Sequence, residues 1–203
     1  MRPAYGAEET GIFGLNVTVV VDVANVMGSR PDGWWRDRAG AAVRLHDQIA
    51  QLAAAGRVTV PGDGQSPGGD PGSAEHPDPG ERGQNAPAFV LVLEGAARAA
   101  VPRLQQARHS AVDEPSAAAA SSRPGRAGPL RPGEVRIVEA RGSGDDTIVA
   151  VVHELPGRRV VVTADRELRA RCVAAGAEIL GPGWLLALLP ESRNPRGSRE
   201  PKG

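Results

Sequence analysis

The chain is poor in cysteine, in aromatic residues and in lysine. Cys172 is the only cysteine among 203 residues, which excludes a disulfide framework and a thiolate zinc site. Aromatic residues make up 3% of the chain, and Lys202 is the only lysine, so nearly all positive charge is arginine. Because Lys and Arg together number 24, as do Asp and Glu, the net charge is zero and gives no sign of a nucleic-acid partner. Any such binding has to come from a local patch.

Long apolar runs are also absent. No segment reaches the roughly 18 uninterrupted apolar residues of a membrane span. The first 16 residues contain two acids and no apolar run, which is unlike a signal peptide. We therefore expect a soluble, cytoplasmic protein that does not associate with membranes.

Two internal stretches are rich in small residues and show no apolar periodicity. Residues 61–87 hold seven Gly and six Pro, and residues 102–134 include the run SAAAASSRPGRAGPLRPG. Such segments bury too little apolar surface to offset chain entropy, so we expect flexible insertions at both places. We also expect disorder at 1–16 and 190–203. Residues 17–189 then form one domain of ordinary size around these insertions.

The rest of the chain alternates between apolar strands and amphipathic helices. Strands that are apolar on both faces predict an α/β domain of three layers, with a parallel sheet covered on both sides. The expected strands are 17–23, 89–93, 135–138, 160–163 and 177–180, with 58–60 as a short strand or strand start. The expected helices are 36–55, 145–155, 166–175 and 182–189.

Acidic side chains follow the strands at the points where the strands end. In strand order these acids are Asp22, Glu94, Asp145 with Asp146, and Asp165. Because parallel strands direct their C-terminal ends to one edge of the sheet, the acids are expected to meet there, together with Asn25. Carboxylates gathered in this way repel one another unless a cation is present. Mg²⁺ or Mn²⁺, which take oxygen ligands, fit such a site.

Each acid also has a purely structural explanation. The three acids after the third and fourth strands precede helices, where a carboxylate caps free N–H groups and interacts favourably with the helix dipole. One cap suffices for one helix, so two adjacent acids exceed that need. Asp22 precedes no evident helix, and its structural alternative is a turn with Asn25. The alternative for Glu94 is a solvated acid at a strand end.

Three short motifs in this order carry a family resemblance. They are Asp22 with Asn25, Asp145 and Asp146 with Ile148, and Asp165 with Arg166. The ordered set resembles the NYN branch of the PIN-like nuclease fold, in particular bacterial NYN ribonucleases and the catalytic domains of animal CCCH-finger endoribonucleases. The resemblance covers most of the ordered core. It implies a Mg²⁺- or Mn²⁺-dependent endoribonuclease whose acids hold metal and activate water, with Asn25 orienting a carboxylate or phosphate. Glu94 lies outside these motifs and is expected to assist as a further metal ligand because of its place at a strand end.

Arginine and tryptophan side chains near these acids are candidates for RNA contact. Trp34 and Trp35 are suited to base stacking, although a tryptophan there also suits anchoring of the first helix on the core. The candidate phosphate contacts are Arg30, Arg36 and Arg38 in one set and Arg141, Arg166 and Arg169 in another. The alternative for the arginines is a solvated surface.

The sequence therefore predicts a metal-dependent endoribonuclease with RNA as its partner. Two alternatives stay open. One is a metal-dependent nucleoside triphosphate pyrophosphohydrolase, which needs similar chemistry. The other is an RNA-binding or scaffold protein without activity. The oligomeric state, including a homodimer, is also open.

Overall fold

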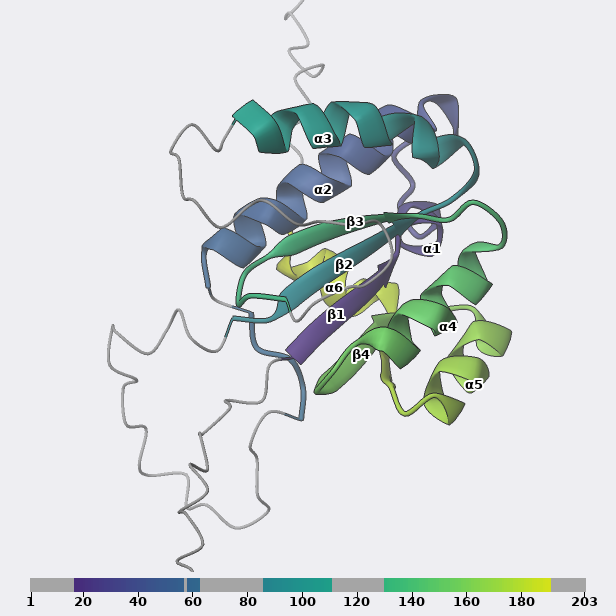
Figure 1. The fold of residues 1–203 in the computed structure, drawn as a ribbon. Helices are drawn as coiled ribbons and strands as arrows, with labels where there is room; N and C mark the ends of the chain where they lie inside the picture. The colour runs from purple at the N-terminus through teal and green to yellow at the C-terminus, as the bar shows by residue number, and fades with distance from the viewer. Residues whose placement is uncertain (1–16, 57, 63–85, 111–129, 191–203) are drawn as a thin grey trace, which may run out of the picture.

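A five-stranded parallel sheet forms the centre of the fold (Figure 1). The computed structural model describes residues 17–56, 58–62, 86–110 and 130–190. The strands lie in the order β3-β2-β1-β4-β5. Their bounds are Val17–Asp22 for β1, Ala88–Leu93 for β2, Val135–Glu139 for β3, Arg158–Val162 for β4 and Glu178–Leu180 for β5. The predicted α/β class with a parallel sheet is confirmed.

Helices cover both faces of this sheet (Figure 1). They are α1 (Val23–Gly28), α2 (Arg38–Ala54), α3 (Val101–Ser110), α4 (Gly144–Glu154), α5 (Arg166–Ala174) and α6 (Pro182–Leu188), with 3-10 turns η1 (Trp34–Arg36) and η2 (Gly95–Ala100). Alternate strand residues enter two separate cores. Val19 and Val21 pack in the core under α1, α2, α3 and α6, whereas Val20 packs in the core under α4 and α5. The fold therefore has three layers.

The sheet grows in two directions from β1. The chain passes from β1 to β2 and then β3 on one side, and β4 afterwards pairs with the other side of β1. Asp22, the last residue of β1, lies opposite Val92 of β2, and Val21 lies opposite Val162 of β4. The connection from β1 leads to α1 and α2 on one face of the sheet, whereas the connection from β4 leads to α5 on the other face. They open a crevice at the C-terminal ends of these two strands, the usual position of a ligand site in such folds.

Some expectations about local structure are wrong. Residues 58–60 form no strand in the described part of the chain, although Val58 and Val60 are buried. A short helix, α1, follows Asp22 directly, with Val23, Val26 and Met27 buried at helical spacing. The 3-10 turn η1 delays the start of α2 to Arg38, because Asp37 caps that helix through the Gly40 N–H.

The predicted insertion from residue 102 is also wrong in its first part. Helix α3 occupies Val101–Ser110, with Val101 and Leu104 buried in the core one helical turn apart. Its remaining sequence is polar, which made it look like a loop. Residues 63–85 and 111–129 and both predicted disordered ends, apart from Pro190, lie outside the described residues. No helix of the described ranges is long and apolar enough to cross a membrane.

Candidate functional site

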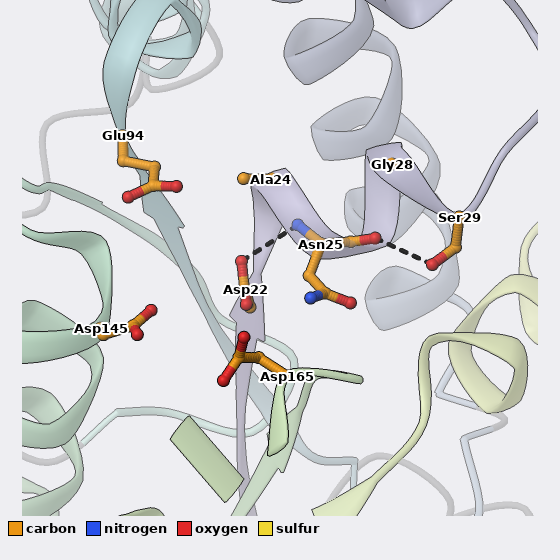
Figure 2. Close-up of a pocket in the computed structure, with 8 residues that line it drawn as sticks. All are labelled: Asp22, Ala24, Asn25, Gly28, Ser29, Glu94, Asp145 and Asp165. Carbon is orange, nitrogen blue, oxygen red and sulfur yellow. Dashed lines mark hydrogen bonds between the residues drawn. The ribbon is translucent and has the colours of Figure 1, made fainter. Parts of the chain in front are cut away.

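A solvent-open cavity of about 470 Å³ lies at the crevice between β1 and β4. Its walls are Asp22, Ala24, Asn25, Gly28, Ser29, Glu94, Asp145 and Asp165. Figure 2 shows the carboxylates of Glu94, Asp145 and Asp165 directed toward the space around Asp22. Four of the five acids expected at this edge, and Asn25, are therefore brought together.

The alternation of side chains along the strands explains why these acids share one side of the sheet. Asp22 follows Val20 by two residues, and Glu94 follows Val92 by two. Val20 and Val92 both lie in the core under α4 and α5, so Asp22 and Glu94 point to the same face. Helices α4 and α5 begin at this edge, and their first residues bring Asp145 and Asp165 to it.

Asp22 is a buried carboxylate with both oxygens bonded. Its side chain caps the N-terminus of α1, where Oδ1 accepts the backbone N–H of Asn25 at 3.1 Å. Oδ2 accepts the hydroxyl of Thr163 at 2.9 Å, and the residue is 9% exposed. The turn considered for Asp22 and Asn25 is therefore not formed, and Asp22 caps a helix instead. The carboxylate is held in one orientation at the floor of the cavity.

The loop after β4 is fastened to the end of β1 by two further bonds. The Thr163 hydroxyl oxygen accepts the N–H of Asp165 at 3.1 Å. The side-chain oxygen of Asn25 accepts the N–H of Ala164 at 3.0 Å. Asn25 therefore positions the loop that carries Asp165. Thr163 was missed by the sequence analysis, although a hydroxyl directly after an apolar strand is a detectable signal.

Asp165 is the cap of α5, as its structural alternative predicted. Its Oδ1 accepts the N–H of Leu168 at 2.8 Å. Capping uses one oxygen of the carboxylate, and the residue also lines the cavity. The structural and the functional explanation are therefore compatible for this acid.

Helix α4 is capped by Ser143, not by an acid. The Ser143 hydroxyl oxygen accepts the N–H of Asp146 at 3.3 Å. The capping part of the structural explanation is therefore wrong for Asp145 and Asp146, although both lie in the first turn of α4, where the helix dipole favours a carboxylate. Asp145 lines the cavity, whereas Asp146 is exposed, does not line it, and forms an ion pair with Arg171 of α5.

Glu94 is fixed at the beginning of α4. Its Oε2 accepts the backbone N–H of Gly144 at 3.0 Å. A Cβ atom on Gly144 would overlap the Glu94 carboxylate, so glycine is needed there for this close approach. Glu94 is therefore not a freely solvated acid at a strand end, the alternative considered from the sequence. It is held by this bond and lines the cavity.

Burial and neighbouring carboxylates disfavour the negative charge of Asp22 and Asp145. Burial raises the pKa of Asp22, and the nearby Glu94 and Asp145 raise it further, against the lowering effect of the bonds from Asn25 and Thr163. Burial also raises the pKa of Asp145, with Asp165 and Glu94 acting in the same direction. A cation in the cavity would relieve this repulsion.

The donors of the cavity suit a hard divalent ion. All four acids offer carboxylate oxygens, the ligands that Mg²⁺ and Mn²⁺ prefer. Within the described ranges, no three Asp, Glu, His or Cys side chains form a ready-made metal cluster. Mg²⁺ usually keeps several waters and uses one or two carboxylates, so the arrangement fits an ion held partly through water.

The two tryptophans lie beside the cavity and not in its wall. Trp34 packs partly against the core, and its ring lies 3.7 Å from the position a Cβ on Gly28 would take. Trp35 is 56% exposed and meets Trp34 edge to face at 6.4 Å. The guanidinium groups of Arg36 and Arg38 lie over Trp35 and Trp34 at 5.9 and 5.3 Å. Core anchoring thus fits Trp34, while Trp35 offers an open face.

The remaining predicted contact residues are spread around the cavity. Arg30 lines a second cavity next to the first. Arg141, Arg166 and Arg169 are exposed, and Arg166 begins α5 directly after Asp165. None of these arginines lines the acidic cavity itself.

Comparison of the chain with protein-family models, with curated proteins and with solved structures gives no match. The resemblance to the NYN branch thus stays an expectation that rests on the motifs.

Proposed function

We propose that the chain is a metal-dependent endoribonuclease acting at the C-terminal edge of its sheet. The observation that carries the proposal is the environment of Asp22. This buried carboxylate, fixed through both oxygens, lies at the floor of an open cavity ringed by three further acids from other elements. Capping explains Asp22 and Asp165 one at a time, but it does not explain why four carboxylates gather around one open cavity. A cation-dependent function is the simplest explanation of that grouping.

Mg²⁺ or Mn²⁺ would be held by Asp22 and Asp145, with Glu94 and Asp165 in the same wall to bind through water. When bound, such an ion lowers the pKa of a coordinated water and offsets charge on a phosphodiester during its cleavage. The proposal leaves Asp146 outside this set, because the exposed residue is paired with Arg171.

The chain's own residues would orient the reacting groups. The N–H of Asn25 and the hydroxyl of Thr163 hold the Asp22 carboxylate, and the Asn25 amide holds the loop that bears Asp165. The cavity opens to solvent, which suits a polymer that passes across it. The exposed face of Trp35 and the neighbouring arginines offer stacking and charge for a single strand.

The test is cleavage of a labelled single-stranded RNA by purified protein with Mg²⁺ or Mn²⁺. Asp22→Asn keeps the size of the side chain and removes its charge. Glu154→Gln is the matched control, since Glu154 is exposed at the last residue of α4 and lines neither cavity. We expect metal-dependent cleavage that Asp22→Asn abolishes and Glu154→Gln leaves intact.

Other outcomes would replace the proposal. Hydrolysis of nucleoside triphosphates with RNA left intact would favour the pyrophosphohydrolase. RNA binding without cleavage under either metal would favour an inactive binding protein.

A further inference from the structure

A second cavity, of about 320 Å³, adjoins the acidic one. Ser29 lines both, so the two share a wall. The second cavity is bounded by Ser29, Arg30, Pro31, Asp32, Gln48, Leu186, Leu189 and Pro190. Its volume is at the lower end of the range for small-molecule sites. The acidic site does not account for it.

Arg30 supplies the positive charge of this cavity. Burial lowers the pKa of its guanidinium. Among the described residues, its Nη1 donates to the Gln48 side-chain oxygen at 3.0 Å, and it forms no ion pair within 4.0 Å. Asp32, in the same cavity wall, acts on this pKa in the opposite direction, but the effect of burial is the larger. Burial of a guanidinium is costly unless an anion pairs with it closely.

Gln48 holds Arg30 in place. The amide nitrogen of Gln48 donates to the carbonyl oxygen of Pro190, 142 residues further along the chain, at 2.8 Å. Gln48 itself is 9% exposed. The guanidinium is therefore anchored to α2 and, through Gln48, to the end of α6. Its remaining N–H donors are preorganised for an acceptor.

The other walls of the cavity are mainly apolar. Leu189 is buried and Leu186 half-buried, both on the α6 side. Asp32 is the one carboxylate in the wall, and its Oδ1 accepts the N–H of Trp34 at 3.1 Å. A cation and an apolar surface in one cavity match a nucleotide unit, which joins an anionic phosphate to a base with apolar faces.

We infer that the second cavity is a nucleotide subsite, in which Arg30 binds a phosphate adjacent to the one that is cleaved and Leu186 and Leu189 contact its nucleoside. This inference rests on the proposed nuclease function and specifies its substrate. A base within a duplex is paired and stacked, so it cannot enter a cavity of this kind. The substrate is therefore single-stranded at this position.

The test measures the affinity of the whole chain for a short fluorescent oligoribonucleotide in the presence of EDTA, so that cleavage does not interfere. The variants are Arg30→Gln and Arg30→Lys. Arg103→Gln is the matched control, because Arg103 is exposed on α3, lines neither cavity and carries the same charge. Circular dichroism reports whether each variant is folded.

We expect Arg30→Gln to weaken binding of the single strand about tenfold or more, since the loss of one charge-assisted hydrogen bond removes at least the roughly 1.4 kcal/mol that corresponds to a factor of ten in Kd. The slope of log K against log salt concentration should become less steep by about 0.7, the value for one phosphate contact with a single strand. Arg30→Lys should retain part of the affinity, and Arg103→Gln most of it. Binding of the matching duplex should be weak in all four proteins.

Two results would overturn the inference. One is equal loss of affinity in Arg30→Gln and Arg103→Gln, and the other is a wild-type protein that prefers the duplex or binds neither. The proposed function is judged separately by cleavage with metal. If the wild-type protein cleaves RNA but Arg30→Gln binds the single strand as well as the wild type does, the subsite is contradicted and the nuclease is not. If binding depends on Arg30 but no RNA is cleaved with metal, the nuclease is contradicted and a single-strand binding site remains.

Discussion

Asp22 and Thr163 are 141 residues apart in the chain, yet the Thr163 hydroxyl donates to the Asp22 carboxylate at 2.9 Å. The same oxygen of Thr163 accepts the N–H of Asp165. One hydroxyl therefore links Asp22, at the end of β1, to Asp165, which caps α5. Thr163 is fully buried, so this hydroxyl lies between the two acids without contact with solvent.

Thr163→Val removes this hydroxyl with little change of shape. The Asp22 carboxylate then loses a buried partner and the Asp165 N–H loses a partly buried one. An unsatisfied buried group costs about 1–3 kcal/mol, and a partly buried one costs less. We expect a lower free energy of unfolding in urea and weaker cleavage activity. Thr163→Ser keeps the hydroxyl and should retain most of both. Equal behaviour of the two variants would show that the hydroxyl has no such role.

The raised pKa of Asp22 predicts how stability depends on pH. The folded state holds this proton more tightly than the unfolded chain, so the contribution of Asp22 to stability is full below its ordinary pKa of 3.8. That contribution is lost as the pH rises through the raised pKa. Asp22→Asn keeps a good helix cap and carries no charge. In EDTA, it should therefore gain stability relative to the wild type as the pH rises from about 3 toward neutrality.

Urea unfolding of both proteins over this pH range checks the sign. A variant that is less stable by the same amount at every pH would contradict it. Added Mg²⁺ should reverse the order at neutral pH, because an ion that binds only the folded wild type stabilises it by about 2.7 kcal/mol at 100 times its Kd.

Gly144→Ala tests the position of Glu94. The added Cβ would overlap the Glu94 carboxylate and displace it from the N–H of Gly144. Since groups that orient metal ligands contribute about 10- to 100-fold, we expect a loss of activity in this range or a higher metal requirement. Gly142→Ala is the control, because its Cβ would meet no atom within 4 Å. Similar activities of the two variants would mean that Glu94 is not needed in its present place.

Asp145 and Asp146 are expected to differ in function although they are neighbours. Asp145→Asn should lower metal-dependent cleavage about 10- to 100-fold or more. Asp146→Asn should have only a small effect on cleavage, because the exposed Asp146 carboxylate forms an ion pair with Arg171 and does not line the cavity. If Asp146→Asn abolished cleavage in a folded protein, Asp146 would belong to the metal site.

The sequence predicts most of the sheet because its strands are apolar on both faces. The acids at the strand ends then follow from the common direction of parallel strands, and four of them do line one cavity. The choice between Asp145 and Asp146 is different. Neighbouring helix residues are separated by about 100° around the axis, so only the packing of α4 decides which one faces the cavity.

Other parts of the site depend on contacts that sequence patterns do not show. Ser143, and not an acid, caps α4, although serine and aspartate are equally good caps. Helix α1 is only six residues long, too short for its periodicity to stand out after an apolar strand. The anchoring of Arg30 by Gln48 and Pro190 joins residues far apart in the chain, and no local pattern predicts it.

The most direct measurement uses a circular single-stranded RNA, which has no ends and is linearised only by an endonuclease. The protein is incubated with the circle and Mn²⁺, and Asp22→Asn and Asp145→Asn are tested beside it. The account predicts linear and then shorter products with the wild type and intact circles with EDTA or either variant. Circles left intact by the wild-type protein with both Mn²⁺ and Mg²⁺, or cut equally by the variants, would contradict an endoribonuclease at this acidic edge.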